Sequence, residues 1–193
     1  MKLGIFGGSF NPPHMGHLIV IETVRDILQF DKILFIPSAQ TPNKQNTLLA
    51  PSSARLEMVN LTVSGSKYFE ASDIEIQRRG ISYTIDTVNE LAARYPRFEI
   101  SLIIGADNLM EFETWKSPDE VLAKAGLVVM SRPGLDLHSI KSKYARSANF
   151  VNVPQIGISG TDIRRRVKLG RSIHYLVLQQ VEDYIIQKRL YKE

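Results

Sequence analysis

The sequence contains no cysteine among its 193 residues. This absence excludes disulfide bonds, thiolate catalysis and cysteine-held metal centres, and it is typical of a cytoplasmic protein. No apolar run approaches the roughly 20 residues that a membrane-spanning helix needs. A signal-peptide pattern is also missing, because the short apolar run Leu3–Phe6 is broken at once by Gly7 and Gly8. We therefore expect a cytoplasmic protein with no membrane partner.

A strong excess of one charge is lacking as well. The net charge is +4, and 44% apolar with 23% charged residues is ordinary for a globular protein. Basic residues gather at Arg78–Arg79 and Arg164–Arg166, but no aromatic residues are interleaved with them and no nucleic-acid-binding motif is present. Small anionic substrates account equally well for the excess. We expect no nucleic-acid partner, and the sequence leaves open whether the chain forms a homo-oligomer.

Apolar runs alternate with amphipathic stretches along the whole chain, and no linker or internal repeat interrupts them. This alternation predicts an α/β fold with a doubly wound parallel sheet, in one domain covering residues 1–193. Such sheets bind ligands at the carboxyl ends of their strands. The expected strands are 2–6, 32–36, 69–76, 100–104, 127–130 and 150–153. The expected helices are 16–29, 51–64, 84–95, 118–125, 159–168 and 176–189, and the longest irregular segments are 37–49 and 132–149.

The segment from Gly7 to His17 is the most informative part of the sequence. It follows a buried strand and leads directly into a helix, where backbone N–H groups and the helix dipole favour a phosphate. His14 and His17 are three residues apart at the helix entry, so both imidazoles can project to one side. Neutral or cationic imidazoles beside a phosphate can stabilise negative charge that develops on phosphorus. The alternative is a purely structural Gly/Pro turn with structural histidines.

Other phosphate and metal motifs do not fit this segment. No Gly-Lys-Ser/Thr follows the glycines, and the Gly-x-Gly-x-x-Gly fingerprint of dehydrogenases is missing. Zinc is a poor interpretation, because the sequence has neither cysteine nor a His-Glu-x-x-His helix.

Two further segments place polar groups at strand ends. Gly105 permits close approach of a ligand, and Asp107 can accept hydrogen bonds from ribose hydroxyls, or it can cap a helix that begins near Asn108. Ser159 and Asp162 have the spacing of a capping box. The intervening Thr161, and Arg164 one turn on, can hold a polyphosphate with the free N–H groups of this helix start.

The run Gly-Ser-Phe-Asn-Pro-Pro-His-x-Gly-His at residues 8–17 resembles the signature of the nucleotidyltransferase superfamily with the His-x-Gly-His motif. Ile158–Arg164 resembles a second signature of that superfamily. From residue 2 to about 191 the chain is similar to the bacterial nicotinate-mononucleotide adenylyltransferases of NAD biosynthesis. The resemblance implies a Rossmann-like fold and transfer of AMP from ATP to nicotinate mononucleotide, giving deamido-NAD and pyrophosphate by direct in-line attack.

The resemblance also implies a set of functional residues. His14, His17 and Arg164 are the expected catalytic residues, and Mg²⁺ is the expected cofactor, bridging substrate phosphates without protein ligands. The expected ATP-binding residues are Gly7, Gly8, Ser9, Phe10, His14, His17, Gly105, Asp107, Ser159, Thr161 and Arg164.

The mononucleotide is expected at two other segments. Trp115, the only tryptophan, can stack on the pyridine ring, and the helix start at Thr84 can bind the nicotinate carboxylate. Alternatively, Thr84 only caps its helix, Trp115 only fills a core gap, and Lys44 is a solvated lysine. The full set of expected mononucleotide-binding residues is Ser9, Lys44, Tyr83, Thr84, Trp115 and Arg132.

The sequence departs from the family pattern at three positions. Asn11 stands where many relatives carry Asp, Asn43 where some have His, and Lys116 where some place a second aromatic residue. Two alternatives stay open: a nucleotidyltransferase acting on another acceptor, such as nicotinamide mononucleotide or phosphopantetheine, and a non-catalytic nucleotide sensor.

Overall fold

The computed structural model describes residues 1–40, 49–131 and 142–192. Six parallel strands form one sheet in the order β3–β2–β1–β4–β5–β6. The order reverses between β1 and β4, which is where parallel sheets of this type open a crevice for ligands. The predicted doubly wound sheet is therefore confirmed. The strands are β1 (Lys2–Gly8), β2 (Lys32–Pro37), β3 (Phe69–Ala71), β4 (Glu99–Gly105), β5 (Gly126–Ser131) and β6 (Ala148–Asn152).

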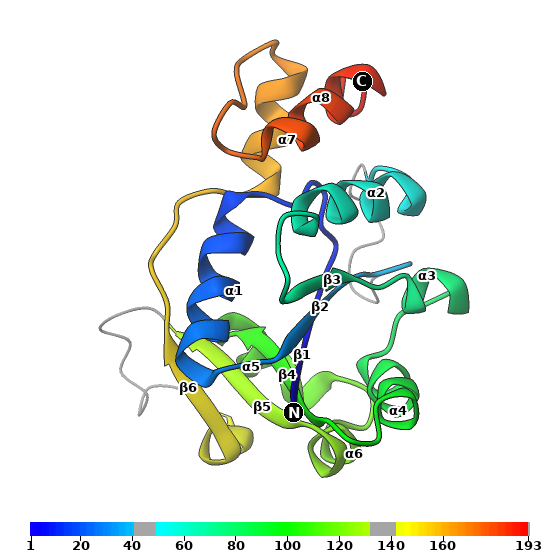
Figure 1. Cartoon of the computed structure of the whole chain (residues 1–193), viewed down its shortest axis with the longest axis vertical. Helices are drawn as coiled ribbons and strands as arrows, with labels where there is room; N and C mark the ends of the chain where they lie inside the picture. Colours follow the sequence, from blue (N-terminus) through cyan, green and yellow to red (C-terminus); the bar gives the residue numbers. More distant parts are fainter. Residues whose placement is uncertain (41–48, 132–141, 193) are drawn as a thin grey trace.

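Helices cover both faces of the sheet (Figure 1). On one face, Leu91 of α4 and Val121 of α6 share a core with Ile5 of β1. On the other face, Val24 of α1 packs with Phe35 of β2. The described helices are α1 (Met15–Leu28), α2 (Ser52–Val63), α3 (Ile74–Arg78), α4 (Thr84–Arg94), α5 (Ala106–Glu111), α6 (Pro118–Lys124), α7 (Gly160–Lys168) and α8 (Gln179–Gln187), with 3₁₀ turns η1 (Phe112–Thr114) and η3 (Lys143–Ser147).

The helices α7 and α8 form a lobe at one end of the molecule, beyond the sheet (Figure 1). A third apolar cluster joins this lobe to α2 through Met58, Ile163 and Val181. All three side chains are fully buried. The lobe is thereby held against α2. Within the described ranges, no helix is long and apolar enough to cross a membrane.

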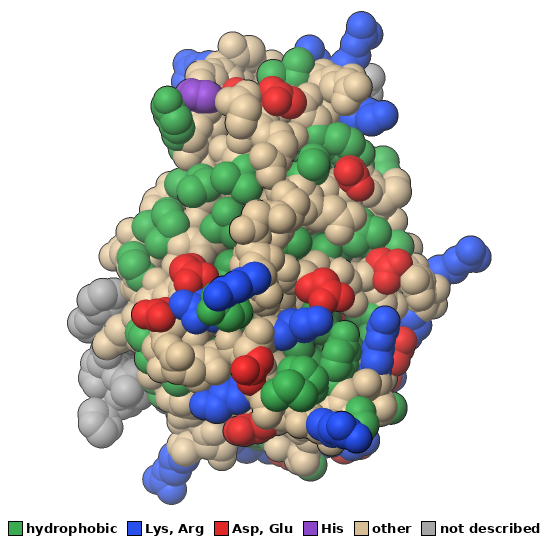
Figure 2. Space-filling model, viewed as in Figure 1, with side chains coloured by type: hydrophobic (Ala, Val, Ile, Leu, Met, Phe, Trp, Pro, Cys, Tyr) green, Lys and Arg blue, Asp and Glu red, His purple; other side chains and the backbone are tan. Residues whose placement is uncertain are grey.

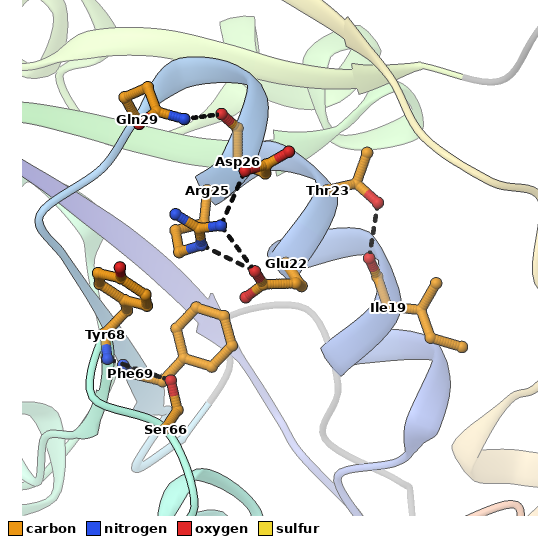
Figure 3. Close-up of polar contacts among 9 residues, drawn as sticks. All are labelled: Ile19, Glu22, Thr23, Arg25, Asp26, Gln29, Ser66, Tyr68 and Phe69. Atoms are coloured by element: carbon orange, nitrogen blue, oxygen red, sulfur yellow. Dashed lines mark hydrogen bonds and ion pairs between the residues drawn. The ribbon is translucent and has the colours of Figure 1, made fainter.

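The helix α1 shows why its sequence folds as an amphipathic element. Its residues Ile21 and Val24 are fully buried against the sheet. On its other side Arg25 donates hydrogen bonds to Glu22 and Asp26 (Figure 3). Apolar residues on one side and exposed ion pairs on the other fix which face of the helix packs. The side that packs determines the direction in which the helix start presents its histidines.

The predicted strand 69–76 is wrong beyond residue 71. The strand β3 ends at Ala71, and Ile74–Arg78 forms the short helix α3. The alternating isoleucines at 74 and 76 suggest a strand, but the backbone N–H of Gln77 donates to the carbonyl of Asp73 in a helical turn. Ser72 and Asp73 are turn-forming residues, and they stop the edge strand.

Other differences lie at element ends. The strand β1 continues through Gly7 and Gly8, which pair with Ile36 and Pro37 of β2. The segment 132–149 was expected to be irregular, but Lys143–Ser147 is a 3₁₀ turn and β6 begins at Ala148. The helix α8 begins three residues later than expected, because residues 174 and 177 form a β-bridge.

Candidate active site

A cleft of about 710 Å³ opens at the carboxyl ends of β4 and β5, beside the start of α1. Such a volume accommodates a nucleotide-sized ligand. Asp107 is the only acidic side chain among the described residues that line it. Because the end of β4 and the start of α1, which follows β1, both border it, the cleft lies where the strand order reverses. Its lining includes His14, Gly16, His17, Gly105, Ala106, Asp107, Met130, Ser131 and residues 153–158.

The two histidines stack at the entrance to α1. Their ring centroids are 3.7 Å apart with an interplanar angle of 25°. The backbone N–H of His14 donates to Nδ1 of His17 at 3.1 Å. Gly16 makes room for this arrangement, because a Cβ atom there would lie 3.0 Å from Nδ1 of His14. A larger residue at the glycine of the His-x-Gly-His motif would therefore crowd His14. The prediction that both imidazoles lie on one side is confirmed.

Both imidazoles are neutral at physiological pH. Burial lowers the pKa of His14 to about 4, and burial together with the charge of His14 lowers the pKa of His17 to about 3. Because Nδ1 of neutral His17 accepts a hydrogen bond, its proton is on Nε2. His17 can therefore donate a hydrogen bond to an anion without carrying a charge. Its ring packs edge-on against Phe6 and Phe10.

The residues between β1 and α1 have different roles from one another. Gly7 is exposed, and Gly8 and Ser9 are partly exposed at the end of β1. Phe10 was expected to bind ATP, but its side chain is only 2% exposed and contacts Phe6 and Phe35. Only the backbone of Phe10 is left to face a ligand.

Arg55 is a residue that the sequence analysis missed. Its side chain is 1% exposed and donates to three backbone carbonyls, those of Ser9 (2.8 Å), Ala39 (3.2 Å) and Ala50 (3.0 Å). Burial lowers its pKa. The guanidinium thereby joins the segments that follow β1 and β2 to the segment that precedes α2. From the sequence, an arginine on an amphipathic helix is predicted to be solvent-exposed, and the spacing of its neighbours does not indicate that it is buried.

Asn11 is a second structural junction. Its side-chain oxygen accepts hydrogen bonds from the backbone N–H of Ala50 (3.0 Å) and the hydroxyl of Tyr191 (2.8 Å). Its carbonyl accepts a hydrogen bond from Nη1 of Arg164 at 2.7 Å. An amide at this position thus ties the phosphate-binding segment to the C-terminal lobe. Burial raises the pKa of Tyr191, so the phenol stays protonated and can donate.

The start of α7 matches its predicted cap in part. Ser159 is the N-cap, and its Oγ accepts from the N–H of Asp162. The reciprocal half of the box is replaced, because the carboxylate of Asp162 binds Arg165 (2.6 Å) and Arg166 (2.7 Å). These hydrogen bonds, from Arg166 first, lower the pKa of Asp162. Arg164 points instead to Asn11, as the 100° step between helical residues requires.

Arg164 does not line the cleft that holds the histidines. Its Nη1 contacts the carbonyl of Asn11, and its Nη2 donates to Thr161 at 3.2 Å. Ser159 directly follows Ile158, the last residue of the chain that lines that cleft, but neither Ser159 nor Thr161 lines it. The structure therefore does not bring the predicted phosphate contacts of α7 into the cleft lining, and their role in ATP binding stays a prediction.

The end of β4 places Gly105 and Asp107 in the cleft together. The alternative role of Asp107 as a helix cap is wrong, because α5 begins at Ala106 and its N-cap is Gly105. Asp107 is exposed and lies in the first turn of α5. Its carboxylate is positioned where a ribose could meet it, and that contact stays a prediction.

The two segments expected to bind the mononucleotide lie side by side. Nζ of Lys116 lies 4.4 Å from the centre of the Tyr83 ring and 3.8 Å from a carboxylate oxygen of Asp86. Thr84 is the first residue of α4, and the N-cap, Tyr83, makes no side-chain capping hydrogen bond. Trp115 is partly exposed and packs on Phe112. Thr84 is thus not the cap of its helix. Trp115 packs against the core and is partly exposed, so both of its expected roles stay open.

Two of the expected residues, Lys44 and Arg132, lie outside the described residues, as does Asn43. Within the described ranges, no three His, Asp or Glu side chains gather to hold a metal ion. The cleft offers Asp107 alone as a carboxylate. Mg²⁺ commonly binds through one or two carboxylates together with substrate phosphates and water, so this lining is compatible with the ion.

Comparisons with known proteins identify the family of this chain. A family model described as "Cytidylyltransferase-like" matches residues 5–166. A protein of Salinibacter ruber with the name "Probable nicotinate-nucleotide adenylyltransferase" is 40% identical over 192 residues, which cover 100% of this chain and 98% of the relative. A protein of the same name from Geobacillus thermodenitrificans is 43% identical over 190 residues, covering 98% and 86%.

A solved structure shows the same fold at lower identity. It is the Plasmodium falciparum nicotinic acid mononucleotide adenylyltransferase complexed with NaAD, with a TM-score of 0.77 and 18% identity, covering 98% of this chain and 97% of that chain. The assignment of this chain to a family rests on the full-length relatives at about 40% identity. The chain belongs to the nicotinate-nucleotide adenylyltransferase family of cytidylyltransferase-like proteins.

Proposed function

We propose that this protein transfers AMP from ATP to nicotinate mononucleotide, giving deamido-NAD and pyrophosphate, and that it does so in the cytoplasm as a step of NAD biosynthesis. The observation that carries the proposal is the pair of neutral, stacked histidines at the start of α1, lining a nucleotide-sized cleft. Full-length similarity to nicotinate-nucleotide adenylyltransferases supports the choice of acceptor.

The reaction is a direct in-line transfer. A phosphate oxygen of the mononucleotide attacks the α-phosphorus of ATP, the bond from that phosphorus to the bridging oxygen breaks, and pyrophosphate leaves with the electron pair. Such a transfer depends on positioning and charge stabilisation more than on covalent participation by the protein. Nε2–H of His17 donates to an oxygen of the α-phosphoryl group, where negative charge develops. His14 stacks on His17 and holds its ring in place.

The remaining groups position the ATP. Asp107 accepts hydrogen bonds from the ribose hydroxyls, and Gly105 leaves room for the nucleoside. At the edge of the cleft, the N–H groups at the start of α7, with Thr161 and Arg164, hold the leaving pyrophosphate. Mg²⁺ carried by the phosphates of ATP supplies neutralisation of their charge.

The acceptor is recognised on the other side of the phosphate-binding segment. The uncapped N-terminus of α4 offers donors to the nicotinate carboxylate, and Trp115 stacks on the pyridine ring. Ser9, with Lys44 and Arg132, binds the mononucleotide phosphate. Asp86 faces Lys116 at 3.8 Å, so the acidic group nearest this helix start has a cation as its neighbour.

Release of pyrophosphate from ATP in the presence of each acceptor in turn tests this function. We expect release with nicotinate mononucleotide, weaker release with nicotinamide mononucleotide, and none with phosphopantetheine. Release with phosphopantetheine alone would assign the chain to another acceptor. Binding of ATP with no release for any acceptor would favour a nucleotide sensor.

A further inference from the structure

A second cleft lies on the C-terminal lobe, away from the histidines. It has a volume of about 470 Å³ and is formed by α7, the residues just before α2 and the segment after α8. None of the residues that line it lines the histidine cleft. Five of its lining residues are basic, and no acidic residue is among the described ones. The basic residues are Arg164, Arg165, Lys168, Arg189 and Lys192.

Most of the basic residues of this cleft form no ion pair with another described residue. Within the described residues, Arg165 is the only one of the five with an ion pair, to Asp162. The N-cap of the 12-residue helix α2 is Pro51, which also lines the cleft, and the first turn of α2 has no acidic residue. The positive end of the α2 dipole therefore adds to the cationic charge. Figure 2 shows Lys and Arg side chains at the outer edge of this lobe.

The arrangement of the cations selects the kind of ligand. Arg164 and Lys168 are four residues apart on α7, so their side chains lie on one side of the helix. Arg189 and Lys192 approach from a different segment of the chain. Cations on two walls of a small cleft match a compact ligand with several negative charges, and one phosphate group cannot contact all of them. The hydroxyl of Tyr191, which also lines the cleft, donates to Asn11.

We propose that this cleft is a second anion site, which binds a condensed phosphate: pyrophosphate, a longer chain of linked phosphates, or the polyphosphate part of a nucleotide. Arg165, Lys168, Arg189 and Lys192 bind it, and none of these four belongs to the ATP-binding set assigned above. Arg164 lines the second cleft only, and its guanidinium donates to the carbonyl of Asn11 in the segment that follows β1. The site is separate from the histidine cleft and does not depend on the adenylyl transfer.

Calorimetric titration with inorganic tripolyphosphate tests the proposal. The full chain is first saturated with a non-hydrolysable ATP analogue, so that the histidine cleft is filled. We expect one further equivalent of tripolyphosphate to bind, with an affinity that falls as NaCl is raised. The stoichiometry of the analogue itself is measured first, because two equivalents would show that the nucleotide also fills the second cleft. Absence of tripolyphosphate binding on a protein that holds one equivalent of the analogue would overturn the proposal, because the anion would then have no site outside the ATP cleft.

A pair of double variants locates the binding. Arg189→Gln with Lys192→Gln should weaken tripolyphosphate binding at least tenfold. The matched control is Arg171→Gln with Lys188→Gln, which removes the same charge from the same lobe at residues that do not line the cleft. The control should change the affinity less than twofold, and both variants should keep the melting temperature of the parent. Equal weakening in the two variants, or none in the first, would overturn the proposal in favour of a diffuse charge effect or another site.

The same titration identifies the source of the phosphate. Tripolyphosphate, pyrophosphate and ATP are compared as the second ligand on the saturated protein. Tighter binding of the inorganic anions assigns the site to free condensed phosphate, and tighter binding of ATP assigns it to a nucleotide. Because binding is measured without turnover, failure of the adenylyl transfer and failure of this site give different results.

Discussion

The histidines at the start of α1 and the consecutive arginines of α7 differ in their burial and in how they find their partners. His14 is buried and His17 is partly buried at the cleft, and both have lost their charge because burial lowers both pKa values. The arginines lie at the surface of the lobe, where Arg165 and Arg166 share Asp162 while Arg164 turns to Asn11. A neutral donor avoids the cost of a buried charge and still stabilises an anion. The partner of each exposed arginine depends on the direction in which the helix places its side chain.

The largest effect on catalysis is expected at His17. His17→Ala should lower turnover by roughly a hundredfold or more, because loss of one donor to a developing charge costs about 2.7–4 kcal/mol. The control is His174→Ala, since His174 pairs with Glu182 on the C-terminal lobe. Steady-state release of pyrophosphate measures both. A folded His17→Ala protein with near-normal turnover would remove this histidine from the mechanism.

Arg55 is buried like His14, but its role is to hold backbone segments together and so to stabilise the fold. Arg55→Met should lower the free energy of unfolding by about 3 kcal/mol, because one buried and two partly buried carbonyls lose their donor and each loss costs about 1 kcal/mol or more. Arg166→Met, at a partly exposed ion pair, should cost less than about 1 kcal/mol. Urea unfolding compares the two variants, and equal losses would contradict the assigned role.

The arginines of α7 should differ among themselves in ATP use. Arg164→Ala should lower kcat/KM for ATP at least tenfold, since it removes the contact to the phosphate-binding segment. Arg166→Ala should have little effect, because its partner is Asp162. Equal losses from the two variants would indicate a general electrostatic effect in place of a defined contact.

The preference for the acid substrate over the amide should correspond to a smaller free energy than the loss of the His17 donor. Donors at the N-terminus of α4 favour a carboxylate, whereas an amide presents hydrogens that clash with donors. We expect kcat/KM for nicotinate mononucleotide to exceed that for nicotinamide mononucleotide at least tenfold, or about 1.4 kcal/mol. Parallel kinetics with the two acceptors measure this ratio. A ratio near one would mean that the base is recognised elsewhere.

Much of this molecule follows from local sequence patterns. The parallel sheet could be predicted, because buried parallel strands appear in the sequence as continuous apolar runs. The His-x-Gly-His spacing predicted two imidazoles on one side of α1, and they stack there. Short elements escaped prediction, since the two isoleucines of α3 have the spacing of a strand.

The contacts that join distant segments could not be predicted. Arg55 reaches Ser9 across 46 positions, and Tyr191 reaches Asn11 across 180. Neither residue type nor spacing reveals such partners, because they arise only when segments far apart in the sequence pack together. The neutrality of the histidines is also a property of the packed structure. The sequence left both charge states open, and burial decides between them.

The protonation of the two histidines tests the central claim most directly. Their pKa values of about 4 and 3 lie below the unfolded value near 6.5, so the folded state binds fewer protons and stability is lost as the pH falls below 6.5. Nitrogen-15 NMR of the imidazoles reads charge and tautomer directly. We expect both rings to be neutral at pH 6, with the proton of His17 on Nε2. A charged imidazolium at either position at pH 6 would contradict the account.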